Sequence, residues 1–147
     1  MKNKEFARLL FPRTMIFLVL AMNLQCALTY ILNPLPYVAP FELSGEPGRA
    51  AVIGIGILFV MWQVPYVFAL AHPLRNRRSL LEAVLMQGIG LVGETLLLRS
   101  IPLLHTALRA SILRFVIFDA AGLLFLLAAA AYTIRLLKFK PGESHVN

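Results

Sequence analysis

Residues 115–137 read FVIFDAAGLLFLLAAAAYTIRLL, an apolar run that contains one acid, Asp119, and one base, Arg135. A helix of about 20 apolar residues is long enough to cross the hydrocarbon core of a bilayer. Three further apolar runs of similar length lie at 14–32, 50–71 and 80–98. The sequence therefore predicts an all-α integral membrane protein, in which four transmembrane helices form a single domain over residues 1–147.

The composition supports this prediction and narrows the classes of function. Of the 147 residues, 59% are hydrophobic and 14% are charged, whereas soluble domains carry about 25% charged residues. The formal net charge of +7 would suit a nucleic-acid-binding protein, but the basic residues lie at the ends of the apolar runs. We therefore expect no nucleic-acid partner. The single cysteine, Cys26, excludes an internal disulfide and most cysteine-based metal sites.

The distribution of basic residues predicts the orientation in the membrane. In an antiparallel up-down bundle of four helices, the N-terminal segment, the second connection and the C-terminal segment share one side. Ten of the 14 Lys and Arg residues belong to that side, namely Lys2, Lys4, Arg8, Arg13, Arg75, Arg77, Arg78, Arg135, Lys138 and Lys140. The other side has Arg49, Arg99, Arg109 and Arg114. The positive-inside rule then predicts a cell-membrane protein with both termini in the cytoplasm.

The two external connections are predicted to differ in structure. Residues 33–49 contain four prolines, which exclude a regular helix and favour turns or extended backbone. In this loop, Tyr37 and Phe41 are expected to anchor the chain at the lipid interface; the alternative is a lid over an external pocket. Residues 99–114 carry apolar side chains at helical spacing, so a short interfacial helix is expected there; the alternative is a continuation of the third helix above the lipid.

Two local signals concern helix ends and bends. Ser79 and Glu82 form the S/T-x-x-E pattern of a capping box, which predicts that the third helix begins at Ser79. Pro65 lies inside the second apolar run and has no N–H to donate, so a bend is expected there, next to Trp62 and Gln63.

Every apolar run also contains polar side chains. Asn23, Gln63 and Gln87 are expected near the middle of the bilayer, where helix backbones are already satisfied and side-chain amides must bond with one another or with water. Such contacts stabilise a bundle by about 0.6–2 kcal/mol each. The third run has one face that combines small and polar residues and is predicted to point inward. This face consists of Ala83, Gln87, Gly90 and Glu94.

Glu94 and Asp119 are unusual in apolar runs, because an acid inside a bilayer is energetically costly. By default, such an acid is either paired or functional. Ion pairs across helices are expected between Asp119 and Arg99, and between Glu94 and either Arg114 or Arg109. Two interpretations stay open: the ion pairs clamp the third and fourth helices together, or the acids line a cavity open to the outer side. The candidate cluster consists of Glu94, Asp119, Arg99, Arg109, Arg114, Gln87, Gln63 and Trp62.

No motif identifies a catalytic residue, a metal site or a cofactor, since the chain lacks G-x-S-x-G, H-E-x-x-H and a phosphate loop. An enzyme is therefore not the favoured interpretation. The short connections favour an accessory or structural subunit of a membrane complex, whose partners are the bilayer and other subunits or further copies of this chain. The alternative is a binder of, or enzyme acting on, a hydrophobic small molecule in an outward-facing pocket lined by Glu94 and Asp119. A fully packed interior at these side chains would exclude this alternative.

Overall fold

The computed structural model describes residues 2–138, with side chains from Ala7 onward, and this part of the chain is almost entirely helical. Lys140 and the side chains of Lys2 and Lys4, which contributed to the predicted orientation, lie outside the described residues. Within the described part, four helical segments are long and apolar enough to cross a membrane. They are Ala7–Leu32, Gly45–Ala71, Arg77–Ser100 and Thr106–Lys138. The fold is thus compatible with a small multi-pass membrane protein.

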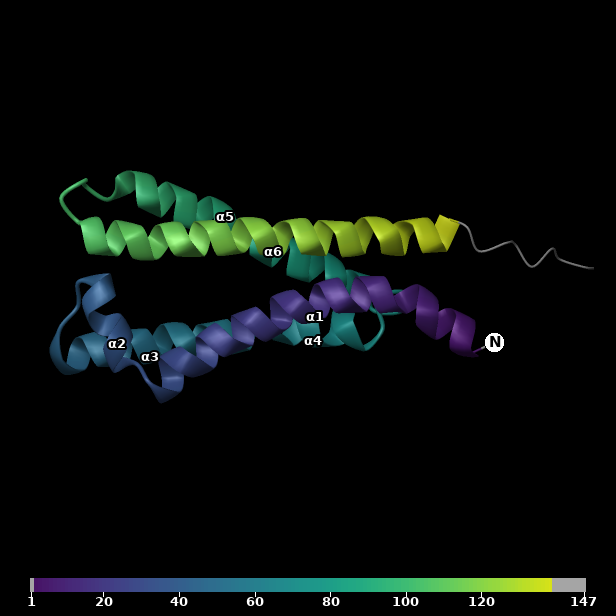
Figure 1. The fold of residues 1–147 in the computed structure, drawn as a ribbon, viewed down its shortest axis with the longest axis horizontal. Coiled ribbons are helices and arrows are strands. Elements are labelled where there is room, and N and C mark those ends of the chain that lie inside the picture. The colour runs from purple at the N-terminus through teal and green to yellow at the C-terminus, as the bar shows by residue number, and fades with distance from the viewer. Residues whose placement is uncertain (1, 139–147) are drawn as a thin grey trace, which may run out of the picture.

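The helical elements follow one another with short connections. In chain order they are α1 (Lys2–Leu32), α2 (Leu35–Val38), the 3-10 helix η1 (Ala39–Phe41), α3 (Gly45–Trp62), α4 (Val64–Ala71), α5 (Arg77–Ser100) and α6 (Thr106–Lys138). Figure 1 shows that α1 begins and α6 ends at one end of the molecule, whereas α2 and η1 lie at the other. We call these the terminal end and the η1 end.

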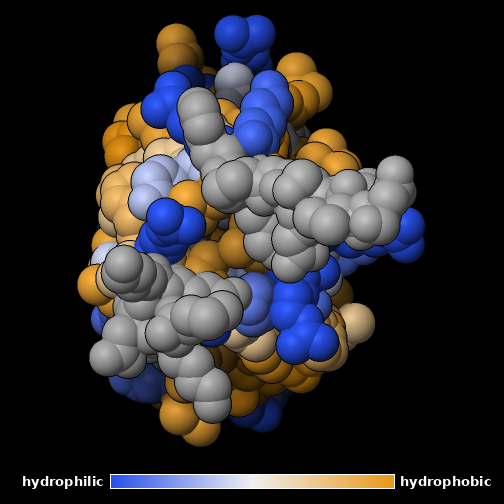
Figure 2. Space-filling view, turned by 90° about the vertical axis from the view of Figure 1, so that its right-hand side faces the viewer, coloured by the Kyte–Doolittle hydropathy of each residue, from blue (hydrophilic) through white to orange (hydrophobic). Residues whose placement is uncertain are grey.

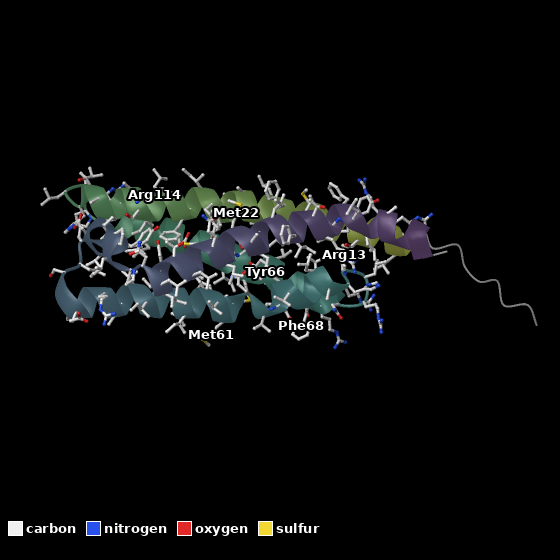
Figure 3. All side chains as sticks on the ribbon, turned by 60° about the horizontal axis from the view of Figure 1, so that its bottom comes forward. Arg13, Met22, Met61, Tyr66, Phe68 and Arg114 are labelled. Carbon is white, nitrogen blue, oxygen red and sulfur yellow. The ribbon has the colours of Figure 1, made fainter. Side chains whose placement is uncertain are left out.

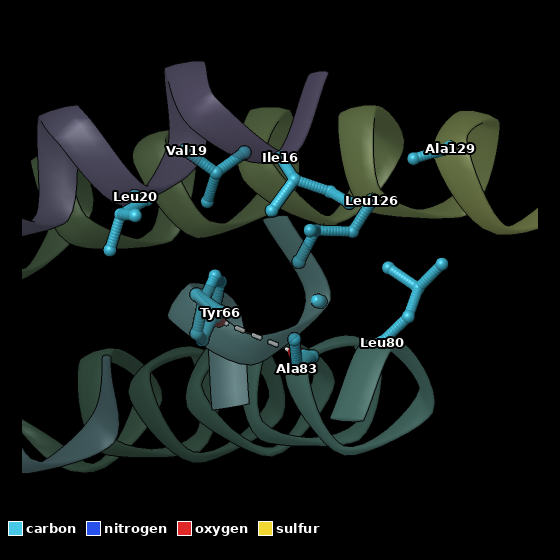
Figure 4. Close-up of a cluster of buried hydrophobic side chains, with 9 residues drawn as sticks. Ile16, Val19, Leu20, Tyr66, Leu80, Ala83, Leu126 and Ala129 are labelled. Carbon is cyan, nitrogen blue, oxygen red and sulfur yellow. Dashed lines mark hydrogen bonds between the residues drawn. The ribbon is translucent and has the colours of Figure 1, made fainter. Parts of the chain in front are cut away.

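The helices meet most closely in the half of the molecule near the terminal end. There α1 packs on α4 and α6, and α5 packs on α4 and α6, so that a common apolar core forms among them. Figure 4 shows this core, in which Ile16, Val19 and Leu126 are almost completely buried. Toward the η1 end the pair α1–α3 separates from the pair α5–α6 (Figure 1). This separation determines where the cavity described below can form.

The break between α3 and α4 follows from Pro65, as the sequence predicted. α3 ends at Trp62 and α4 begins at Val64, with Gln63 between them. The backbone N–H of Gln63 donates to the carbonyl of Val60, three residues earlier, at 3.0 Å. The side-chain amide of Gln63 donates to the carbonyl of Phe59 at 2.9 Å. Gln63 therefore satisfies a backbone acceptor that the interrupted helix would otherwise leave open inside an apolar region.

Three local expectations differ from the structure. The proline-rich segment does contain helical turns, because Pro34 and Pro36 lie at the start of α2, where a missing N–H costs no helical bond. Residues 106–114 form no separate interfacial helix but are the first turns of α6, which has 33 residues and a length of about 50 Å. α5 begins at Arg77 with Asn76 as its N-cap, so Ser79 lies inside the helix.

The outer surface suits a lipid environment. Met61 and Phe68 are 60% and 55% exposed and point away from the bundle, whereas Tyr66 lies between the helices (Figure 3). At the terminal end, hydrophilic and apolar residues are interspersed, as Figure 2 shows. The cations described at this end are Arg8, Arg13, Arg75, Arg77, Arg78, Arg135 and Lys138.

Candidate functional site: a cavity with a polar floor

A cavity of about 370 Å³ occupies the space where the two helix pairs separate. All four long helical segments and η1 contribute to its lining, from Met22 of α1 to Asp119 of α6. Small-molecule sites in proteins have volumes of about 300–1,000 Å³ and combine apolar walls with a few polar groups. The interior is therefore not fully packed at the candidate residues.

The floor of the cavity is a chain of hydrogen bonds that joins α4, α5 and α6. The Tyr66 hydroxyl donates to Oε1 of Gln87 at 2.6 Å, and Nε2 of Gln87 donates to Oδ1 of Asp119 at 2.8 Å. Tyr66 and Gln87 are 2% and 4% exposed. Beside this chain, Nδ2 of Asn23 donates to Oε1 of Gln63 at 3.3 Å. Since buried polar groups are costly when unpaired, this chain fixes the rotamers of the floor.

Two glycines make these bonds sterically feasible. The carboxylate of Asp119 lies directly over Gly90 of α5, so close that a Cβ at this position would collide with Oδ2. On the facing helix, a Cβ at Gly122 would lie 2.8 Å from Nε2 of Gln87. Small residues allow helices in a membrane to approach closely. Gly90 and Gly122 thus allow the side chains of α5 and α6 to cross between the two helices.

Glu94 lies one helical turn beyond Gly90 on the same face of α5 and also lines the cavity. Its Oε2 atom is buried and has no hydrogen-bond partner among the described residues. A buried polar atom without a partner is rare in native structures and calls for an explanation. The inward-pointing face predicted for the third apolar run is confirmed, because Ala83 and Gln87 are buried and Gly90 and Glu94 line the cavity.

Aromatic side chains form the wall toward the η1 end. The Tyr30 ring lies 4.6 Å from that of Tyr37 and 6.0 Å from that of Phe41, between ring centroids. Phe115 of α6 contacts Phe41 and Phe59 at 6.1 and 6.0 Å. Aromatic pairs at these distances contribute about 0.5–1.5 kcal/mol beyond the area that they bury. Tyr37 and Phe41 thus belong to the cavity wall, which favours the lid over the lipid anchor.

The end of η1 is fastened to the start of α6 by Glu42. This residue has a left-handed backbone, with φ of 57°, which is unusual for a side chain other than glycine. One carboxylate oxygen bonds to Nδ1 of His105, and the other accepts the N–H of Leu108 at 3.3 Å. The carboxylate thereby caps the N-terminus of α6, where orphan N–H groups and the helix dipole favour negative charge. Ser111 adds a bond to the carbonyl of Pro40 at 2.9 Å.

Acid is expected to loosen this fastening. The hydrogen bond from His105 is the main cause that holds the pKa of Glu42 below its ordinary value, and the Leu108 N–H acts in the same direction. A lowered pKa means that the stabilisation is complete above the ordinary carboxyl pKa of about 4.3 and is lost as the pH falls through the lower, folded value. Hydrogen exchange of the Leu108 amide should therefore accelerate in acid relative to its intrinsic rate.

The matched variants for this experiment are Glu42→Gln and Glu46→Gln, both in the same connection. Glu42→Gln should show faster Leu108 exchange already at neutral pH and no further loss of protection in acid. Glu46 is exposed and, among the described residues, pairs with Arg49 three positions away, so Glu46→Gln should behave like the natural chain. Equal Leu108 protection in the natural chain and Glu42→Gln at neutral pH would contradict the prediction.

The structure brings together most of the predicted cluster but not its ion pairs. The residues that line the cavity are Glu94, Asp119, Arg114, Gln87, Gln63 and Trp62. Arg99 is exposed at the end of α5, and Arg109 donates to the carbonyls of Leu98 and Ile101. Within residues 7–138, neither acid forms an ion pair with an arginine. Backbone carbonyls bind the guanidinium group of Arg109, Ser111 binds that of Arg114, and Gln87 binds Asp119 in place of an arginine.

The sequence analysis did not place four residues in the site: Tyr66, Glu42, His105 and Tyr30. Tyr66 follows Gln63 by three positions and so lies on the same helix face, a signal that could have been used. Glu42 and His105 are 63 residues apart, and their bond leaves no trace in the local sequence. In the sequence, Tyr30 cannot be told apart from an ordinary tyrosine at the lipid interface. Only the tertiary fold distinguishes it.

The arrangement of acids does not resemble a metal centre, because no three His, Cys, Asp or Glu side chains gather within the described residues. The chain matches no known protein-family model, and neither the curated proteins nor the solved structures include a match to it. The chemistry of the site must therefore be judged from its own geometry.

Proposed function

We propose that this protein binds a hydrophobic small molecule in the cavity between its two helix pairs. The observation that supports this most directly is an unfilled space of about 370 Å³ with aromatic walls and a hydrogen-bonded floor. A chain that served only as a structural subunit would gain stability from filling this space, since unfilled apolar volume forfeits packing contacts. The accessory-subunit function expected from the sequence stays a prediction.

The ligand in this proposal comes from the lipid phase. Two residues that line the cavity keep large exposed fractions, because Met22 of α1 is 44% exposed and Trp62 of α3 is 47% exposed, so the cavity is open between the helices at these side chains. At the η1 end, by contrast, Phe41 and the Glu42 fastening lie between the cavity and the end of the molecule. A ligand that enters between the helices therefore has to displace fewer hydrogen-bonded side chains than a ligand that enters along the bundle axis.

The proposal includes the orientation predicted from the basic residues. We infer an up-down bundle that crosses the cell membrane four times, with the terminal end in the cytoplasm and the η1 end outside. In support of this, the terminal end carries the greater number of arginine and lysine side chains, as the positive-inside rule requires. The cavity then lies in the outer half of the bilayer. Accessibility of single cysteines introduced at Glu46 and Arg77 to an impermeant thiol reagent tests this orientation.

The binding proposal is tested with photoreactive dodecyl probes in reconstituted vesicles. Three probes share a diazirine in the alkyl chain and differ in the head group, which is an alcohol, an amine or a carboxylic acid. At least one probe should label the wall residues Tyr30, Phe59 or Phe115 saturably, so that an excess of the same compound without the diazirine prevents labelling. Labelling of the outward-facing Phe68 should not saturate, because bulk lipid phase surrounds it.

A cavity-filling variant and a matched control complete this experiment. Cys26 lines the cavity on α1, so Cys26→Trp should remove the saturable labelling while the chain stays folded. Leu28 of the same helix is 43% exposed to the outside, and Leu28→Trp should leave labelling unchanged. If none of the three probes labels the wall saturably, the binding proposal is wrong and the accessory-subunit function becomes the better interpretation.

A further inference from the structure

The floor of the cavity is asymmetric in its hydrogen-bonding capacity. The Tyr66 hydroxyl and a hydrogen of the Gln87 amide are both directed along the chain toward Asp119, where the chain ends. A carboxylate accepts several hydrogen bonds, and the chain supplies Asp119 with one from Gln87. An ionised Asp119 can therefore accept further hydrogen bonds at this point of the cavity.

Glu94 adds a second acceptor to the same floor. It lies on the same face of α5 as Gln87 and Gly90, and its buried Oε2 atom has no partner among residues 7–138. Two carboxyl groups thus line one cavity, and the described residues give them a single hydrogen-bond donor, the amide of Gln87. Buried acceptors are stabilised when a donor reaches them, and the stabilisation is larger when the donor is charged.

Arg114 also lines the cavity, but within residues 7–138 it forms no ion pair with either acid. Nη2 of Arg114 donates to Oγ of Ser111 at 3.1 Å, which lies beside η1 rather than beside the floor. Arg114 is also exposed, so water and lipid head groups reach it. The amides of Asn23 and Gln63 already donate to Gln63 Oε1 and to the carbonyl of Phe59. Among residues 7–138, the Gln87 amide is the group that donates a hydrogen bond to either acid, and it donates to Asp119.

We infer that the ligand is an amphiphile whose polar group donates hydrogen bonds, as a hydroxyl or an ammonium does, and that this group binds between Glu94 and Asp119. The inference rests on the proposed function and specifies its substrate class. The apolar body of the ligand then lies against the aromatic wall of Tyr30, Phe59 and Phe115. A carboxylate head group is disfavoured, because it would bring a further acceptor and a negative charge next to two acids.

The comparison of head groups among the same three dodecyl probes tests this inference. We expect dodecylamine and dodecanol to label the wall saturably, and dodecanoic acid to need a concentration at least about tenfold higher, since a charge-assisted hydrogen bond changes affinity by this factor or more. The comparison uses the natural chain, so it does not depend on whether a variant folds. Equal affinity for all three probes, or preference for the acid, would overturn the inference while leaving the binding proposal intact.

A variant pair assigns the preference to Glu94. Glu94→Gln keeps the size of the side chain but removes its charge, and it should weaken dodecylamine labelling by about tenfold and dodecanol labelling less. Glu46→Gln removes an exposed acid outside the cavity and should change neither. If Glu94→Gln keeps the preference for dodecylamine and Asp119→Asn loses it, the ligand contacts Asp119 alone. This result would contradict a site between the two acids. Absence of saturable labelling by any probe rejects the proposed function itself.

Discussion

Replacement of Gly56 by valine is expected to separate α1 from α3 and to lower the free energy of unfolding by about 1–3 kcal/mol or more. A Cβ at this position would lie 2.8 Å from the backbone carbonyl oxygen of Ala27 and 2.8 Å from Cγ1 of Ile31. The carbonyl belongs to the helix backbone, so it has no rotamer into which it can move away. Thermal unfolding in detergent, followed by circular dichroism, measures the effect.

The same helix supplies the control. Gly54 lies two residues earlier in α3, and a Cβ there would meet nothing within 4 Å. Gly54→Val should therefore leave the unfolding temperature unchanged or raise it, because valine has a somewhat higher helix propensity than glycine. If both variants unfold at the same temperature, the close approach of α1 and α3 does not determine stability, and the description of this helix pair is wrong.

Replacement of Gln87 by methionine should have the second largest effect on stability, about 1–3 kcal/mol. Methionine has nearly the length of glutamine but provides neither the carbonyl that accepts from Tyr66 nor the amide that donates to Asp119. The Tyr66 hydroxyl would keep only its longer bond to the carbonyl of Ala83, at 3.3 Å, and the half-buried Asp119 would lose the bond from Gln87. A buried polar group that loses a partner costs more than one net hydrogen bond. Denaturation in detergent measures this loss, and the cavity experiment should show weaker probe binding in parallel.

Gln25→Met is the matched control for this prediction. Gln25 also faces the cavity region, but it is exposed, and no hydrogen bond of its side chain occurs within the described structure. In an apolar environment its replacement should be neutral or slightly stabilising. A loss of stability of the same size in both variants would mean that any amide in a membrane span contributes equally to stability. It would contradict a particular contribution of the Tyr66–Gln87–Asp119 chain.

Several features of the fold could be predicted from local sequence. The four long helices follow from the apolar runs, because only a regular helix satisfies the backbone in a region without water. Pro65 predicts the break after Trp62, since it cannot donate a backbone hydrogen bond. The inward face of α5 follows from the spacing of Gln87, Gly90 and Glu94, because a polar stripe is unfavourable toward lipid.

The partners of the polar side chains could not be predicted in this way. The charges of Glu94, Asp119 and Arg99 suggested ion pairs. In the structure, however, the neutral amide of Gln87 binds Asp119, because Gly90 and Gly122 allow these two side chains to approach each other. The sequence likewise contains the prolines of residues 33–49 but does not indicate the bond between Glu42 and His105 that fastens this segment to the start of α6.

The sequence by itself determined that this chain forms four long apolar helices, and that two acids lie within the last two of them. The physical reason is local: hydropathy, helix propensity and backbone hydrogen bonding depend on neighbours within a few turns. Only the tertiary structure decided that the helix pairs α1–α3 and α5–α6 separate at one end, and that the acids face a cavity rather than arginines. That outcome depends on how closely two helices approach each other. The distance of approach is set by contacts between side chains that are far apart in the sequence.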